Sequence, residues 1–476
     1  MSQVKTIFKN MSWLFVSQVF GAICAFVWTV LIARYLSVSD YGIMNFAVSF
    51  TGMIAITMDL GISTHIVRHI ATDFDSSPKY LGNSLPLKSI FSAFTFFLAL
   101  IILILMHCNG LTIQITLLFT IERIFASFTG LFNGSLQAVE EGKYQAIGNF
   151  LLNILLLIFM LLTITCDYGL YGITFAYLIA NSIVFLSQYI AVKKRVSKPK
   201  LEFDKEFCKK ITILSIPFAL TSFFGIVLYS VDMVMLTNMV NSYANGIYSA
   251  AYKLISVLVL FYSVYSTVIF PVMSRFYKNE KNLLVVSLEK SIKYLMLFMI
   301  PISFATIFYS QEIVVLFFGH KYAPTSSVLS ILICTVPLTF ITGACQNTLN
   351  ASHKEKYVTL TLLIATLFNI VSNFFIIPRY SYDGAAYTNI LSDIIIGILY
   401  FYSIYKLDLM PNNKLYWDLL KMIIASIILY VTLTVLNINM WFALPIGIIV
   451  YLIVIIILKT FDDDDKFIIK EILGKT

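Results

Sequence analysis

Long hydrophobic stretches alternate with short polar segments along the whole chain. Each stretch holds about 20 mostly apolar residues, which is enough for one α-helix to cross a hydrocarbon core roughly 30 Å thick. Strands of a membrane barrel would be only about 10 residues long and would alternate in polarity. We therefore expect an all-α integral membrane protein with about 14 transmembrane helices. The expected spans are 12–34, 43–66, 86–106, 113–136, 145–166, 170–192, 211–236, 247–271, 292–317, 326–349, 358–377, 385–405, 417–436 and 440–458.

Short motifs of the first half recur in the second half at a nearly constant spacing. Gly42-Ile43 recurs as Gly246-Ile247, 204 residues later, and segment 135–144 recurs as segment 348–357, 213 residues later. Because the repeated unit holds an even number of spans, both copies would have the same orientation in the membrane. The pattern predicts two six-helix repeats that form two lobes around a central cavity, followed by two extra C-terminal helices.

The most polar stretch of the chain lies between the sixth and seventh predicted spans, where a cytoplasmic linker would join the two lobes. The C-terminal end carries Asp462–Asp465 followed by Lys466, a sequence that resembles a protease tag site and to which we assign no function. The expected organisation is an N-lobe in 1–192, a linker in 193–210, a C-lobe in 211–405, two further spans in 406–459 and a cytoplasmic tail in 460–476.

Basic residues are distributed unequally between the two sides of the predicted spans. With the N-terminus inside, 28 of the 33 lysines and arginines fall in inside segments and only three fall outside. This asymmetry follows the positive-inside rule and places both termini in the cytoplasm. The net charge of +8 therefore reflects topology, and we expect no binding to nucleic acid.

Composition and missing motifs exclude most enzyme classes. The chain is 59% hydrophobic and only 12% charged, whereas a soluble domain is about one quarter charged. It contains no GxxxxGK[ST], GxSxG or HExxH motif, and it has no long segment that could form a soluble catalytic domain. The six cysteines are scattered, so we expect neither a metal site nor a cofactor. A transporter is the leading class.

Two basic residues, Arg123 and Lys253, lie inside predicted spans and away from the span ends, where a charge is costly unless it faces a partner or a polar cavity. Arg123 either meets an anionic substrate in the cavity or pairs with a carboxylate, with Asp59 and Asp393 as the candidates. Its neighbour Glu122 should point about 100° away around the helix. A guanidinium suits a phosphate group because its donors bind two oxygens at once.

Lys253 is expected to pair with Asp232, and the alternative is that it faces the cavity as a second cation. Arg34, at the outer end of the first span, either reaches lipid headgroups or binds a phosphate of the ligand. Arg68 follows Gly61 and His65 on one helix face and would contact a cytoplasmic headgroup or anchor the helix. The candidate sites for a coupling ion are the acidic residues Asp59, Asp393, Asp232 and Glu122.

Several motifs resemble one transporter family over nearly the whole chain. The run 229–275 is the most specific part of this resemblance. The motifs are Ala33-Arg34-Tyr35-Leu36, Asp59-Leu60-Gly61 through Arg68, Tyr229-x-x-Asp232-x-x-Met235-Leu236, Gly246-Ile247-Tyr248-Ser249-Ala250-Ala251-Tyr252-Lys253, Phe270-Pro271-x-x-Ser274-Arg275, Phe318-Gly319-x-x-Tyr322 and Asn369-x-x-x-Asn373. Together they resemble Wzx-like polysaccharide flippases of the multidrug/oligosaccharidyl-lipid/polysaccharide exporter superfamily.

The resemblance implies a flippase for an undecaprenyl-diphosphate-linked oligosaccharide, the repeat unit of O-antigen (lipopolysaccharide) or capsule. Such a protein moves its substrate by alternating access from the cytoplasmic to the outer leaflet of the bacterial cytoplasmic membrane. It would contact membrane lipids, couple to H⁺ or Na⁺, and work beside a polysaccharide polymerase and glycosyltransferases. We expect a monomer.

Three alternatives stay open. A lipid II flippase would carry a fixed arginine constellation that this chain lacks, and a drug/cation antiporter usually has twelve spans. A membrane glycosyltransferase or polymerase would need a large outer loop, whereas the longest outside segment here is near Gln311–Thr325.

Overall fold

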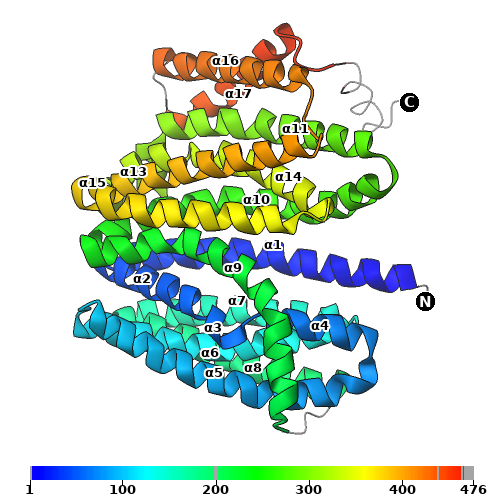
Figure 1. Ribbon diagram of the computed structural model, residues 1–476. Helices are drawn as coiled ribbons and strands as arrows, with labels where there is room; N and C mark the ends of the chain where they lie inside the picture. The colour runs from blue at the N-terminus through cyan, green and yellow to red at the C-terminus, as the bar shows by residue number, and fades with distance from the viewer. Residues whose placement is uncertain (1–2, 198–201, 437–438, 463–464, 466–476) are drawn as a thin grey trace. The chain divides into compact units, whose positions relative to one another are not determined.

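The computed structural model describes residues 3–197, 202–436, 439–462 and 465, and these residues form helices and no strand. The order of helices along the chain is shown in Figure 1. The α-helices are α1 (Gln3–Tyr35), α2 (Val38–Ile54), α3 (Ile56–Asp59), α4 (Ile62–Thr72), α5 (Ser77–Leu105), α6 (Gly110–Ala138), α7 (Gly142–Thr165), α8 (Gly169–Arg195), α9 (Lys205–Met239), α10 (Ser242–Asn279), α11 (Lys281–Phe308), α12 (Ser310–Phe318), α13 (Thr325–Leu332), α14 (Thr335–Ala351), α15 (Glu355–Lys406), α16 (Asn413–Leu436) and α17 (Met440–Ile457). Two 3₁₀ turns, η1 (Phe74–Ser76) and η2 (His320–Tyr322), complete them.

Thirteen helical segments of the described chain are long and apolar enough to cross a membrane. One of them, α15, has 52 residues and is interrupted at Ser381, whose φ of 51° and ψ of −132° are not helical. A straight helix of that length would be about 78 Å long, far more than a bilayer needs. The kink separates the predicted spans 358–377 and 385–405, so the expectation of an all-α membrane protein with about 14 spans is confirmed.

Three predicted spans are broken instead of continuous. The span 43–66 ends at Asp59 and resumes at Ile62, the span 292–317 breaks at Tyr309, and the span 326–349 breaks after Leu332. The mean hydropathy of a window does not detect such breaks, because the residues on both sides of each break are apolar. Discontinuous helices are frequent in secondary transporters, where they place helix ends and carbonyl groups at depth in the membrane.

The structure divides into two compact units. The first contains residues 1–249 and 373–382, and the second contains 250–372 and 383–476. In the first unit α6 packs on α8 and α5, and α7 packs on α1 and α8 (Figure 1). In the second unit α11 packs on α14 and α16, and α17 packs on α16. The lobe limits expected from the repeat, 1–192 and 211–405, remain predictions.

Proline inside α5 explains how the chain before α9 attaches to the first unit. Pro86 has no N–H, so the carbonyl of Gly82 loses its helical donor. The backbone N–H of Glu202 donates to that carbonyl at 3.3 Å, and the N–H of Asp204 donates to Asn83 Oδ1 at 2.7 Å. The end of the predicted linker 193–210 is thus bound to α5 through a group that proline released.

Two glycines that correspond in the predicted repeat contact each other's helices inside the first unit. A Cβ atom on Gly42 would lie 1.8 Å from the carbonyl oxygen of Ser242, and one on Gly246 would lie 2.1 Å from that of Val38. Each contact is the other one shifted by 204 residues. The reciprocity is what a two-fold symmetric repeat predicts, and no residue with a side chain beyond hydrogen fits at either position.

Candidate functional site

The break between α3 and α4 places an aspartate at the start of a helix. Leu60 (φ 43°) and Gly61 (φ 79°) both adopt left-handed conformations, which end α3 and let α4 begin in a new direction. Asp59 then accepts hydrogen bonds from the Ser63 backbone N–H at 3.4 Å and from the Ser63 hydroxyl at 2.5 Å. A carboxylate is favourable there because the first N–H groups of a helix have no intrahelical partner.

Lys88 of α5 completes this cluster. Its side chain is fully buried, it forms an ion pair with Asp59, and its ammonium donates to Ser63 Oγ at 3.3 Å. The Asp59 side chain keeps 29% of its surface exposed. Lys88 lies near the start of the predicted span 86–106 and is one of the 28 basic residues counted as inside, whereas the structure buries it inside α5. The signal was its position within the predicted span 86–106, where a charge requires a partner.

Arg123 and Glu122 form a second ion pair in the first unit. Arg123 Nε lies 3.6 Å from Glu122 Oε2; the Glu122 side chain is buried and that of Arg123 is 32% exposed. Glu122 was expected to point away from Arg123. The two Cβ atoms do start about 100° apart, but both side chains are long enough to bend together. Asp59, a predicted partner of Arg123, has its ion pair with Lys88.

The pair leaves hydrogen-bonding capacity at Arg123. Its Nε–H is buried and has no hydrogen-bond partner among the described residues, because 3.6 Å is beyond a normal hydrogen bond. A guanidinium has five donors and stays charged under all conditions of interest. Arg123 is therefore a cation in a membrane helix, with a partly exposed side chain and one buried N–H that has no partner among the described residues.

Asp232 of α9 is fully buried and holds together three segments of the first unit. Its Oδ2 accepts a hydrogen bond from the Tyr248 hydroxyl at 2.8 Å, and its Oδ1 accepts one from Asn373 Nδ2 at 2.5 Å. These donors come from α10 and from α15, 16 and 141 residues away along the chain. Lys253 belongs to the second unit, so the predicted Asp232–Lys253 pair stays a prediction.

The other predicted residues are spread over both units. Arg34 is exposed near the end of α1, and the backbone of Arg68 lies in α4, while its side chain lies outside the described residues. Lys253 is partly buried on α10. Asp393 is buried on α15 and accepts a hydrogen bond from the Thr339 hydroxyl at 3.3 Å. Of the predicted residues, the structure thus pairs Arg123 with Glu122.

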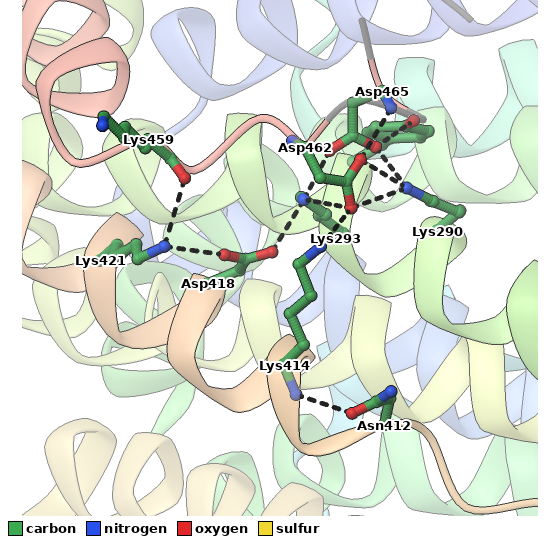
Figure 2. Close-up of polar contacts among 10 residues, drawn as sticks. Lys290, Lys293, Asn412, Lys414, Asp418, Lys421, Lys459, Asp462 and Asp465 are labelled. Carbon is green, nitrogen blue, oxygen red and sulfur yellow. Dashed lines mark hydrogen bonds and ion pairs between the residues drawn. The ribbon is translucent and has the colours of Figure 1, made fainter. Parts of the chain in front are cut away.

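The second unit contains a cluster of lysines and aspartates that was not predicted from the sequence. Lys290 and Lys293 of α11 and Lys414 of α16 gather around Asp462 and Asp465, as Figure 2 shows. The acidic run of the tail was noted, but its partners were not, because the two lysines of α11 lie about 170 residues earlier in the chain and Lys414 lies 48 residues earlier. A spacing of three residues between the two lysines of α11 was the available signal.

The chain is similar to proteins of polysaccharide biosynthesis. Residues 7–277 match the family described as "Polysaccharide biosynthesis protein", and residues 217–375 match the MatE family. The chain is 26% identical over 405 residues to "Capsular polysaccharide biosynthesis protein CapF" of Staphylococcus aureus, which covers 83% of this chain and 98% of that protein. It is 22% identical over 453 residues to "Probable low-salt glycan biosynthesis flippase Agl15" of Haloferax volcanii, covering 91% and 92%.

Solved structures share the fold. The inward closed conformation of lipid II flippase MurJ superposes with a TM-score of 0.76 at 20% identity, covering 94% of this chain and 97% of that one. An inward-facing multidrug resistance MATE family transporter gives 0.69 at 15% identity, covering 84% and 99%. At such identities the likeness extends to the fold alone.

Proposed function

Because this chain belongs to the polysaccharide biosynthesis protein family, we propose that it flips an undecaprenyl-diphosphate-linked oligosaccharide across the membrane. The relatives named for capsular polysaccharide and for a glycan flippase support a lipid-linked sugar as the substrate class. We further propose alternating access as the mechanism, in a bacterial cytoplasmic membrane with both termini inside. The direction is from the cytoplasmic to the outer leaflet, where a polymerase would use the product.

The observation that carries the proposal is Arg123. A diphosphate must leave water to cross the membrane, and a fixed guanidinium compensates its charge with paired donors. Arg123 lies in a membrane helix, is 32% exposed and retains a donor without a partner among the described residues. A cationic drug would instead be repelled at this position, which disfavours the antiporter alternative.

Ion coupling, by H⁺ or Na⁺, is proposed at Asp59. Both oxygens of Asp232 already accept hydrogen bonds, and Glu122 is buried next to Arg123, whereas Asp59 is partly exposed at a helix break. A proton or cation at Asp59 would compete with the Lys88 ammonium. Loss of that ion pair would uncouple α3 and α4 from α5, which is a local change that a gradient could drive.

The proposal is tested in a strain that lacks the gene and has lost its surface polysaccharide. We expect wild type and Arg379→Ala, a matched loss of an exposed arginine, to restore the polymer. Arg123→Ala should reduce it about tenfold or more, because hydrogen bonds to a charged group contribute roughly 1.5–3 kcal/mol. Arg123→Lys keeps the charge but loses the paired donors, and an intermediate level is expected. Protein amounts in the membrane are measured for each variant.

Two results would overturn the proposed role of Arg123 or the proposed flippase function. Full restoration by Arg123→Ala at normal protein level would remove Arg123 from substrate binding. Intact polymer in the deletion strain, together with altered drug sensitivity, would replace the flippase by an antiporter.

A further inference from the structure

In the second unit, Asp462 and Asp465 lie among three lysines, Lys290, Lys293 and Lys414, which we call the lysine pocket. Asp465 accepts hydrogen bonds from Lys290 at 2.5 Å, from Lys293 at 2.6 Å and from the Tyr294 hydroxyl at 2.8 Å (Figure 2). Asp462 accepts hydrogen bonds from Lys290 at 3.2 Å and from Lys414 at 3.0 Å. The oxygens of two carboxylates are therefore gathered by ammonium groups of α11 and α16.

Asp462 and Asp465 also bind each other through their backbone N–H groups. The N–H of Asp465 donates to Asp462 Oδ1 at 2.7 Å, and the N–H of Asp462 donates to Asp465 Oδ2 at 3.0 Å. Asp465 is fully buried, as is Thr460 just after α17. Burial alone would raise the pKa of both carboxyl groups, but hydrogen bonds from backbone and lysine donors outweigh it and hold each pKa below its ordinary value. Both aspartates are thus bound as anions.

The pocket would be strongly cationic without these two carboxylates. Lys293 is almost completely buried, and its remaining acidic partner would be Asp418, 2.8 Å away, which Lys421 also contacts at 3.3 Å. Lys290 is largely buried, and its ion pairs among the described residues are with Asp462 and Asp465. Buried ammonium groups are unstable without an anion, so a site vacated by the tail must attract another one.

We propose that this lysine pocket is a binding site for phosphate groups, and that Asp462 and Asp465 are its displaceable internal occupant. Phosphate offers three or four acceptor oxygens, which can replace the carboxylate oxygens at the lysines and at the Tyr294 hydroxyl. The group comes either from an anionic lipid headgroup or from phosphate in solution. With the expected topology the pocket faces the cytoplasmic leaflet, where basic pockets between membrane helices bind anionic lipids.

Cleavage by a protease can measure how readily Asp462 and Asp465 leave the lysines. Residues 462–466 read Asp-Asp-Asp-Asp-Lys, the recognition sequence of enteropeptidase, which cleaves after the lysine. A protease must bind these side chains, and a buried Asp465 prevents this. We therefore expect slow cleavage of the purified full-length protein. Lys290→Gln, which leaves the recognition sequence unchanged, should be cleaved on the order of tenfold faster or more. Lys281→Gln removes an exposed lysine of the same helix and should be cleaved like wild type.

Ligands distinguish the two sources of phosphate. Wild-type protein is cleaved in nanodiscs of phosphatidylcholine, in nanodiscs with phosphatidylglycerol, and in phosphatidylcholine with inorganic phosphate or sodium chloride at equal ionic strength. Acceleration by phosphatidylglycerol supports a lipid site, and acceleration by phosphate but not chloride supports a soluble ligand. Equal rates in all four conditions, or equal rates for Lys290→Gln and Lys281→Gln, would overturn the proposal. Mass spectrometry of the released residues 467–476 reports each rate directly.

Discussion

At the scale of single residues, the first unit contains two ion pairs that each have a buried member. Lys88 is bound by Asp59, and Arg123 is bound by Glu122. Asp59, Arg123 and Glu122 were candidate site residues from the sequence, whereas Lys88 was not. Burying one ion without its partner is far more costly than burying a pair. Replacing one member of a pair should therefore destabilise the protein more than replacing both members. The two pairs differ in exposure: Lys88 is fully buried, whereas Arg123 keeps an accessible face.

The ion pair between Lys88 and Asp59 predicts that substitutions of these two residues have non-additive effects on the free energy of unfolding. Lys88→Met alone should destabilise the protein by about 2–4 kcal/mol, because Asp59 loses its buried counter-ion; the partial exposure of Asp59 keeps the value at the lower end. Lys88→Met with Asp59→Asn should recover most of that loss. Thermal unfolding of the detergent-solubilised protein measures both. Additive losses would show that the ion pair does not couple the two residues.

The same double variant separates stability from ion coupling. If Asp59 takes up the coupling ion, the stable double variant should still fail to restore the surface polysaccharide. Normal polymer with the double variant would move the coupling site to another acid.

At the scale of elements, the break between α3 and α4 depends on backbone conformation more than on packing. Gly61 has a φ of 79°, where a residue with a side chain is strained. Gly52 lies on the preceding helix α2, and a Cβ there would meet no atom within 4 Å. The two glycines therefore allow the effect of conformation to be measured against the effect of adding a methyl group.

We expect Gly61→Ala to destabilise the protein by about 1–2 kcal/mol and to reduce polysaccharide output, since it favours a straighter helix and displaces Asp59 from Ser63. Gly52→Ala should be neutral or slightly stabilising, because alanine is the better helix former. Thermal unfolding and the complementation assay give the two readouts. Equal behaviour of the two variants would mean that the break is not set by Gly61.

At the scale of the whole molecule, the C-terminal segment responds to pH separately from the spans. The pKa values of Asp462 and Asp465 are lower in the folded protein than the ordinary value near 3.9, so docking of the tail is favoured above that value and lost as the pH falls through the lowered ones. We expect hydrogen exchange of the backbone amides of residues 458–462 and 465, corrected for the chemical rate, to stay slow from pH 7.5 down to pH 5. Loss of protection between pH 5 and 6 would contradict this.

Hydropathy and charge predicted the global features of this molecule because they are properties of single segments. About 14 spans and the membrane class followed from stretches of apolar residues, and the family from the run 229–275. The partners of charged groups did not follow. Lys88 meets Asp59, and Lys293 meets Asp465, only after helices far apart in the chain have packed. The break at Gly61 was not predicted either, because the mean hydropathy of a segment does not depend on its backbone dihedral angles.

The reciprocal contact of Gly42 and Gly246 has an evolutionary meaning. Each glycine lies against the carbonyl of the residue four positions before the other glycine, and identical subunits meet in this reciprocal way across the axis of a two-fold dimer. If one repeat gave rise to both halves, its ancestor already paired with a second copy of itself through this glycine. Fusion of two genes then preserved an interface that had been a contact between separate chains. The two halves have since been free to diverge in charge, but not at the position where their backbones touch.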